Sequence, residues 1–484
     1  MVSALGKLIR WIVMALGVLL LLVLGVRAIV ALTDRSLAPW HSFAPHEPSA
    51  AEIDAMDWSV WRAAEDRVFE EVRENVTLKL TPDQQVPENR FWEGSPLYSP
   101  GFGTDWNRSF VLMPDGAPKG AVVLLHGLTD APYSLRHVAE YYRDHGFVAV
   151  GVRMPGHGTV PGGLAAADWH QWLAATRLAV REAARLAGPG APLDIVGYSN
   201  GGALAMVYAL DALEDPALAR PDRIVLLSPM IGITAFARFS GIAGWPAFLP
   251  GFERAAWLDL FPEFNPFKYN SFPVNGGRQS WLLTQAVQSR IDRLSSTGKL
   301  AGIAPILTFQ AVTDSTVSAG AVVDRLYAKL PANGSELVLY DVNRAAELAP
   351  LLGRPARDAM GRMLPPGPRA YETVTIGDAG PGDPSAVATV TPPGGTAETV
   401  PLGVAYPRAI YSLSHVALPF PPDDGLYGYD PDPADDFGIR LGALAGRGEL
   451  RTLTVGLDWF GRLQANPFHA DMLNRIGAFA GLEN

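Results

Sequence analysis

The chain contains no cysteine among its 484 residues. It therefore forms no disulfide, has no thiol nucleophile and carries no lipidated cysteine of the lipoprotein type. Charged residues are also sparse, at 18% of the sequence, and they sum to a net charge of −10. This acidic balance argues against a nucleic-acid partner, because phosphate backbones bind basic surfaces.

Signals for metal ions and cofactors are missing as well. No group of histidine, aspartate and glutamate residues has the spacing of metal ligands. No Gly-x-Gly-x-x-Gly follows a predicted strand, so a dinucleotide is not indicated. We therefore expect neither a metal nor another cofactor.

An uncharged apolar stretch of sixteen residues, Trp11 to Val26, lies near the amino terminus. Because the side chain of Arg27 can extend toward the headgroups, residues 8–32 could cross a hydrocarbon core of about 30 Å. A cleaved signal peptide is the alternative, yet no Ala-x-Ala site follows the stretch. Positive charges occur on both sides of it. We expect a single-pass transmembrane anchor, with the amino terminus in the cytoplasm and the large domain on the extracytoplasmic side.

Residues 36–104 form an extension of mixed composition. Within it, residues 50–75 place apolar side chains at helical spacing. They are Ile53, Met56, Val60, Trp61, Ala64, Val68 and Val72. This apolar face can pack against the main domain or lie near the membrane surface.

Residues 105–484 are assigned to one large domain in which predicted strands and helices alternate. Strands are expected at 121–125, 147–152, 223–227, 303–312 and 336–341, and helices at 135–145, 165–187, 203–213, 318–330 and 472–480. This alternation is typical of an α/β domain with a mostly parallel central sheet and helices on both faces. The carboxyl ends of the strands then share one edge, where such sheets bind ligands.

One stretch organises this domain. Residues 193–202 read Leu-Asp-Ile-Val-Gly-Tyr-Ser-Asn-Gly-Gly, which predicts an apolar strand, a sharp turn and a helix. Gly-x-Ser-x-Gly between a strand and a helix indicates a nucleophile elbow, with Ser199 in a strained turn. An ordinary strand-to-helix turn is the alternative, since glycine and serine are common residues.

A serine nucleophile needs a base, and the base needs an acid that orients it. In an elbow fold the acid and then the histidine follow the serine. Of the nine histidines, only His415 and His469 do so. His415 lies just after the strand-like residues 409–411, whereas His469 precedes a helix and suggests a surface or capping residue. We expect His415 to be the base.

The acid should end a strand between the serine and the base. Asp314 and Asp341 both follow predicted strands. Asp314 precedes a loop that leads to a helix, whereas a surface strand end is the simpler interpretation of Asp341. We expect Asp314 to fix the tautomer of His415 and to stabilise its protonated form.

Two backbone N–H groups are needed to bind the oxyanion that forms during acyl transfer. One is expected from Asn200, after the serine, and the other from Leu128, in the His-Gly-Leu-Thr loop at 126–129. His126 precedes the elbow, so we expect it to shape this loop. His157 is interpreted as a residue that packs a loop.

Two insertions interrupt the alternation. In residues 229–300, aromatic side chains either form a small core that holds the insertion together or act as a lid with an apolar wall for an acyl chain, and we expect some of each. They are Phe236, Phe239, Trp245, Phe248, Phe252, Trp257, Phe261, Phe264, Phe267, Tyr269 and Phe272. Residues 342–404 are rich in proline and glycine, with short β-like runs at 371–376 and 386–390. We expect an irregular insertion there.

Five of these features together resemble the serine hydrolases of the α/β-hydrolase fold, with a spacing similar to bacterial carboxylesterases and monoacylglycerol lipases. They are the loop at 126–129, Pro-Gly-His-Gly at 155–158, the elbow at 197–202, Asp314 and His415. The resemblance covers about residues 105–340 and 408–484. It implies ester hydrolysis by a Ser-Asp-His triad without a cofactor, under a lid of variable structure. Asn200 differs from the commoner methionine, leucine or glutamine, and Asp314 lies unusually far from His415.

The sequence thus predicts a membrane-anchored serine hydrolase that cleaves carboxylic esters of hydrophobic acyl chains through an acyl-enzyme on Ser199. Its expected partners are a small-molecule or lipid ester and the membrane. Two alternatives stay open: an acyltransferase that uses the same triad with an alcohol in place of water, and a binding protein on an inactive hydrolase fold. The intact Ser199, Asp314 and His415 argue against the binding protein.

Overall fold

The computed structural model describes residues 37–232, 253–314, 316–346, 358–364, 366–380, 382–408, 410–442 and 465–482, together with Arg354 and isolated positions before residue 26. Among these residues, no helix is both long enough and apolar enough to cross a bilayer. The anchor predicted at residues 8–32 falls largely outside the described part of the chain.

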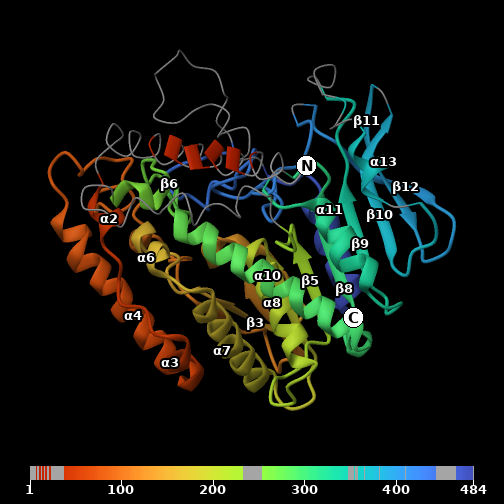
Figure 1. Ribbon diagram of the computed structural model, residues 1–484, viewed down its shortest axis with the longest axis horizontal. Helices are drawn as coiled ribbons and strands as arrows, with labels where there is room; N and C mark the ends of the chain where they lie inside the picture. Colours follow the sequence, from red (N-terminus) through yellow and green to blue (C-terminus); the bar gives the residue numbers. More distant parts are fainter. Residues whose placement is uncertain are drawn as a thin grey trace.

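A ten-stranded sheet runs through the domain in the order β1-β3-β2-β4-β5-β8-β9-β10-β11-β12 (Figure 1). Its strands are β1 (Phe110–Leu112), β2 (Gly120–Leu125), β3 (Phe147–Val152), β4 (Leu193–Tyr198), β5 (Arg223–Leu227), β8 (Ile306–Ala311), β9 (Glu336–Tyr340), β10 (Glu372–Gly380), β11 (Asp383–Thr391) and β12 (Glu398–Ala405). In this sheet order, the strands from β3 through β2, β4, β5, β8 and β9 to β10 are parallel to one another. By contrast, β1, β11 and β12 are antiparallel to their neighbours. The carboxyl ends of the parallel strands share one edge.

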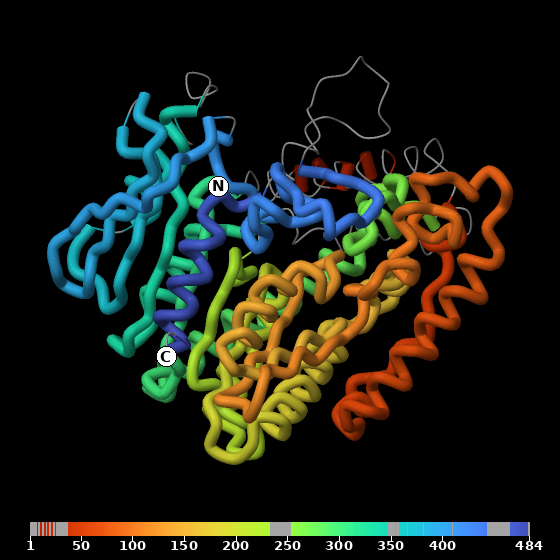
Figure 2. The backbone as a smooth tube through the Cα atoms, turned by 180° about the vertical axis from the view of Figure 1, so that it is seen from behind, coloured from red at the N-terminus to blue at the C-terminus, as the bar shows by residue number. Residues whose placement is uncertain are grey.

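Helices cover both faces of this sheet. On one face lie α5 (Arg136–Asp144) and α15 (His469–Ala480), and α15 stands in front of the strands in Figure 2. On the other face lie α7 (Trp169–Ala187), α8 (Asn200–Ala212) and α10 (Val274–Ser296). The other α-helices in the described part of the chain are α2 (Pro39–Ser42), α3 (Ala50–Ala55), α4 (Trp58–Asn75), α6 (Pro161–Ala166), α11 (Ala319–Ala321) and α13 (Ala359–Met363). The predicted α/β class, with a mostly parallel sheet between helices, is confirmed.

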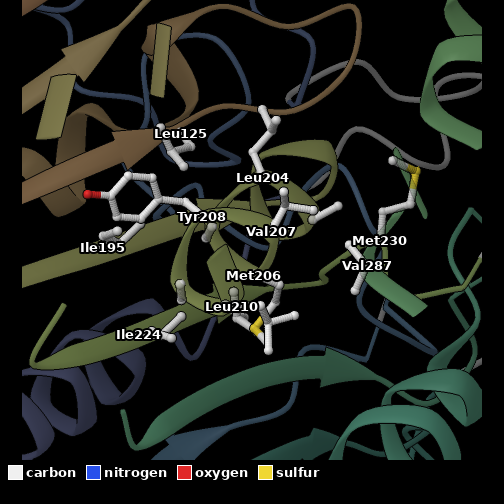
Figure 3. Packing of buried hydrophobic residues seen from close by; sticks show 14 of the residues in the cluster. Leu125, Ile195, Leu204, Met206, Val207, Tyr208, Leu210, Ile224, Met230 and Val287 are labelled. Atoms are coloured by element: carbon white, nitrogen blue, oxygen red, sulfur yellow. The ribbon is translucent and has the colours of Figure 1, made fainter. Parts of the chain in front are cut away.

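Helix α8, which follows the elbow, is apolar around its whole circumference. Every residue in it except Asp211 is buried. Figure 3 shows its side chains among residues of the neighbouring strands and of α10, labelled Leu125, Ile195, Ile224 and Val287. Because a helix that is apolar on all sides is stable only inside a core, the amino end of α8 is held in place at the elbow.

The extension before the main domain packs on that domain. Its predicted helix is two helices, because Asp57 caps a new helix by accepting the Val60 N–H over 2.9 Å. Five residues of the predicted apolar face are buried, and Ile53 and Trp61 join the same core as α7. Of the two alternatives, the structure therefore supports packing against the main domain.

Buried charges tie this extension to the loop after β3. The guanidinium of Arg153 is fully buried and pairs with Glu47 over 2.6 Å and with Glu65 over 3.1 Å. Glu47 also accepts the Gly156 N–H over 2.8 Å. Breaking one partner of such a buried pair costs about 3–5 kcal/mol, so these contacts make the extension part of the folded domain.

The prediction of an irregular insertion at 342–404 is wrong for its second half. There, β10 pairs with β9 in parallel, and β11 and β12 follow as antiparallel strands of the same sheet. Alternating β-branched and small residues explain these strands, since they fit a half-buried pleated surface. The proline and glycine residues at 392–395 form only the turn between β11 and β12.

The described part of the aromatic-rich insertion contains β6 (Trp257–Asp259), β7 (Phe272–Pro273) and α10. Its aromatic side chains at Phe264, Phe267 and Tyr269 are buried, and Phe267 stacks on Tyr133 with the ring centroids 4.0 Å apart. These residues are buried in clusters shared with the rest of the domain, rather than in a separate small core that holds the insertion together. The residues Phe236, Phe239, Trp245, Phe248 and Phe252 lie outside the described part of the chain.

Candidate active site

Ser199 lies in the sharp turn between β4 and α8, with φ 54° and ψ −113°. A side chain at Gly201 would overlap the backbone carbonyl of Leu125, and a Cβ at Gly197 would lie 2.5 Å from the carbonyl oxygen of Gly201. Both positions therefore require glycine. The turn is a nucleophile elbow in its geometry, as the motif predicts.

The strained turn is held by backbone hydrogen bonds to the end of β5. The N–H of Ser199 donates to the Leu227 carbonyl, and the N–H of Met230 donates to the Ser199 carbonyl, each over 2.9 Å. Strain of this kind persists only where the surroundings fix the backbone. The elbow is consequently rigid before any substrate arrives.

The structure brings the three predicted side chains together at the carboxyl edge of the sheet. The Oγ of Ser199 lies 2.9 Å from Nε2 of His415. The Nδ1 of His415 lies 2.8 Å from Oδ2 of Asp314. With Nδ1–H donating to the carboxylate, Nε2 carries the lone pair that can accept the serine proton.

The carboxylate of Asp314 is buried, and both of its oxygens accept hydrogen bonds. Its Oδ1 accepts the backbone N–H groups of Thr316 and Val317, over 2.8 and 3.0 Å, and Nε2 of Gln310 donates to Oδ2 over 3.1 Å. Burial alone would raise the pKa of Asp314, but His415 and the two backbone N–H groups outweigh it and leave the pKa below its ordinary value. The group is thus held ionised beside the imidazole.

The loop that carries His415 is fixed from several sides. The carboxamide of Asn343 donates to the carbonyls of Pro407 and Ile410, over 2.9 and 2.8 Å. The hydroxyls of Thr313 and Ser412 are hydrogen-bonded to each other, which links the chain next to Asp314 to the loop that carries His415. Sequence reasoning missed these residues, because a lone Asn or Thr after a strand is not diagnostic.

The long separation between Asp314 and His415 has a structural explanation. Of the strand expected at 409–411, the described residues Ile410 and Tyr411 do not lie in a strand. Instead, β12 runs parallel to β10 and ends at Ala405, on the edge of the sheet where the site lies. The extra hairpin leads the chain away from the site and back to it.

The predicted oxyanion loop is shaped by His126. Its Nε2 accepts the Met154 N–H over 3.1 Å, so Nδ1 carries the proton and donates to the Gly127 carbonyl over 2.9 Å. Burial, with the nearby His157, lowers the pKa of His126 well below its ordinary value. A neutral ring therefore holds the loop.

Two backbone N–H groups are free to bind an oxyanion. Within the described residues, the Leu128 N–H has no acceptor. Asn200 is the first residue of α8, where an N–H has no acceptor within the helix. The side chain of Asn200 is fully buried, and its Oδ1 accepts the Ser280 hydroxyl of α10 over 3.2 Å.

Asp341 and His469, the less favoured candidates for the acid and the base, make other contacts. Asp341 accepts from the Arg344 guanidinium over 2.7 Å and makes no described contact with His415. His469 is buried rather than on the surface, with Nε2 3.1 Å from the Pro419 carbonyl oxygen. Burial lowers the pKa of His469 to about 3, so the ring is neutral. The expectation of a surface position for His469 is wrong, because its helix packs its first turn into the core.

Known proteins are similar to part of this chain. Residues 116–256 match the family described as serine aminopeptidase, S33. The thermostable monoacylglycerol lipase of Bacillus sp. (strain H-257) is 26% identical over 227 residues, which cover 46% of this chain and 81% of that protein.

Among solved structures, a soluble variant of monoglyceride lipase from Saccharomyces cerevisiae is 15% identical and covers 48% of this chain and 81% of its own, with a TM-score of 0.37. The monoacylglycerol lipase of Paleococcus ferrophilus is 16% identical and covers 48% of this chain and 86% of its own, with a TM-score of 0.35.

The sheet order, the elbow and the family match at residues 116–256 support one class of protein: a serine hydrolase of the α/β-hydrolase fold. The resemblance predicted from the motifs is confirmed. The matches also support, at the level of the family, the predicted enzyme class of a serine ester hydrolase.

Proposed function

We propose that the protein hydrolyses carboxylic esters through an acyl-enzyme on Ser199, with His415 as the base and Asp314 as the acid that orients it. One observation carries the proposal: Nε2 of His415 lies 2.9 Å from Oγ of Ser199 while its Nδ1 lies 2.8 Å from Asp314. This is the geometry in which an imidazole can take the serine proton and later return it to the leaving alcohol.

In the first half of the reaction, Oγ of Ser199 attacks the acyl carbon as its proton moves to Nε2 of His415. The N–H groups of Leu128 and Asn200 bind the oxyanion, each worth about 3 kcal/mol in such sites. The alcohol leaves with the proton from His415. Water, activated by the same nitrogen, then attacks the acyl-enzyme and releases the acid.

A hydrophobic acyl chain is the proposed preference. The relative from Bacillus is named a monoacylglycerol lipase, and its similarity covers 46% of this chain. The aromatic residues at 236–252 supply the apolar composition that an acyl pocket needs.

The proposed location is the membrane. Its support is the sequence of residues 8–32, which is apolar enough and long enough to serve as an anchor, with the catalytic domain on the extracytoplasmic side. Such an anchor would keep the enzyme next to lipid esters.

Labelling with a fluorophosphonate probe tests the nucleophile. The wild-type protein should be labelled and should hydrolyse p-nitrophenyl and monoacylglycerol esters, whereas Ser199→Ala should do neither although it folds. The expected loss in kcat is on the order of 10⁶. Near-normal hydrolysis by a folded Ser199→Ala protein would refute the proposal. Product analysis with and without an added alcohol separates hydrolysis from acyl transfer.

A further inference from the structure

Gln310 is a buried amide beside the triad that the mechanism above does not use. It lies near the carboxyl end of β8, four residues before Asp314, and is fully buried. Its Nε2 donates to Oδ2 of Asp314 and to the backbone carbonyl of Ala311, each over 3.1 Å. Both partners can only accept, so the amide nitrogen must face them and the orientation of the amide is fixed.

An amide at this position is unfavourable for packing alone. The Oε1 of Gln310 is buried and has no hydrogen-bond partner in the described part of the chain. Since a buried polar atom without a partner destabilises the folded state, an aliphatic side chain would serve the core better. Of the two groups that its Nε2 binds, Asp314 is the one that contacts His415.

The four described hydrogen-bond donors to Asp314 lie in different parts of the fold. The N–H groups of Thr316 and Val317 belong to the loop of Asp314 itself, and they bind Oδ1. Gln310 and His415 bind Oδ2. Gln310 alone of these donors lies on a strand of the sheet, and the elbow of Ser199 is attached to that same sheet.

We propose that Gln310 is a positioning residue of the triad, whose amide holds Oδ2 of Asp314 in line with Nδ1 of His415. It does not touch Ser199 or the reacting atoms. The inference rests on the proposed function, because it assigns Gln310 to the same triad. A donor on Oδ2 also favours the ionised carboxylate, which is the form that orients the imidazole.

Two substitutions test this role. Gln310→Met removes the donor but keeps an unbranched side chain of similar length, and kcat should fall about 10-fold while KM changes by less than about 2-fold. Gln310→Glu offers a proton donor only while the new carboxyl group is protonated. It should therefore be more active than Gln310→Met at pH 6, and its activity relative to wild type should fall as the pH rises to 9.

Thr308→Val is the matched control, because Thr308 is equally buried two residues earlier on the same strand and makes no hydrogen bond to the triad. Its kcat should equal that of wild type. A folded Gln310→Met protein with wild-type kcat would overturn the inference. So would a Gln310→Glu protein that is no more active at pH 6 than Gln310→Met, and this second variant decides the case if Gln310→Met does not fold.

Failure of the proposed function would look different. In that case the wild-type protein would hydrolyse no ester, or Ser199→Ala would hydrolyse it as fast as wild type. Measuring Ser199→Ala alongside the Gln310 variants therefore separates the two results.

Discussion

The phenol of Tyr198 donates a hydrogen bond to the backbone carbonyl of His415 over 3.1 Å. The residue before the proposed nucleophile thereby holds the proposed base, and the two aromatic rings lie with their centroids 5.4 Å apart. The base is thus fixed through its main chain as well as through its ring. This contact joins the elbow to a loop that lies more than two hundred residues further along the chain.

Tyr198→Phe should lower kcat about 3- to 10-fold with little change in KM, because it removes one hydrogen bond and keeps the ring. Steady-state kinetics on a short-chain p-nitrophenyl ester measure the effect. Tyr208→Phe is the control, since its hydroxyl donates to the Ala219 carbonyl and not to the site. Equal losses in both variants would contradict a role for the Tyr198 hydroxyl in holding His415.

His415→Ala should inactivate the enzyme, whereas His469→Ala should keep its chemistry. The reason is that His415 bonds to Ser199 and Asp314, while His469 bonds to the Pro419 carbonyl inside the core. Because His469→Ala can lower stability, kcat should be expressed per active site titrated with the fluorophosphonate. The reverse pattern would show that the base has been misassigned.

Replacing Asp194 by asparagine should change how stability depends on pH. Burial raises the pKa of Asp194 to about 7, against the partial opposing effect of Arg223. The folded state thus binds this proton more tightly than the unfolded state, so the contribution is greatest below about pH 4 and is lost as the pH rises through 7.

Relative to wild type, Asp194→Asn should therefore gain unfolding free energy between pH 5 and pH 8, by about 3 kcal/mol at most, because about two of the pH units below its folded pKa of about 7 lie in this interval. Urea titrations at both pH values measure the difference. Asp83→Asn, at an exposed turn position, is the control and should leave the pH dependence unchanged. An equal difference from wild type at pH 5 and pH 8 would rule out Asp194 as the titrating group.

Glu47→Ala should lower the unfolding free energy by about 3 kcal/mol, because it leaves the buried guanidinium of Arg153 without its closest partner. Glu70→Ala removes an exposed carboxylate that pairs with Arg73 and should cost less than about 1 kcal/mol. Chemical denaturation of both variants gives the comparison. Equal small losses would mean that the extension is only loosely attached.

Activity should rise from acetyl to medium-chain esters, since each buried methylene of an acyl chain contributes about 0.8 kcal/mol until the pocket is full. The full-length protein should also stay with membranes through salt or carbonate washing and be released by detergent. Ester panels and membrane fractionation test both expectations. Highest activity on acetyl esters, falling with chain length, would mean that the aromatic residues of the insertion only pack against one another.

Much of the domain could be predicted from the sequence because its signals are local. Fully buried parallel strands such as 147–152 and 223–227 read as apolar runs, and their predicted bounds agree with β3 and β5. Ser199 stands in a motif whose glycines have a steric reason. In this fold the acid and then the histidine follow the serine along the chain. That order left few candidate residues for the acid and for the base.

Other features depend on contacts between distant segments and leave little trace in the sequence. The expected helix at 318–330 is broken into α11, a π-helical turn at 322–326 and a 3-10 turn at 327–329, and the apolar pattern of the sequence does not distinguish these from one continuous helix. The β-like runs at 371–376 and 386–390 overlap β10 and β11, but the sequence predicted neither β12 nor the pairing of these strands with the main sheet. The contacts of Gln310 and Asn343 are visible only in the structure, because their hydrogen-bond partners lie on other segments or loops of the chain.

The strands β10 to β12 provide a position at which the enzyme could be split into two fragments. The turn at 392–395 is exposed and lies between two strands on the outer edge of the sheet (Figure 2). A cut there would leave Ser199 and Asp314 on one fragment and His415 on the other. Hydrolysis would then report whether the two fragments are associated, so this edge of the sheet is a natural place to build a split enzyme.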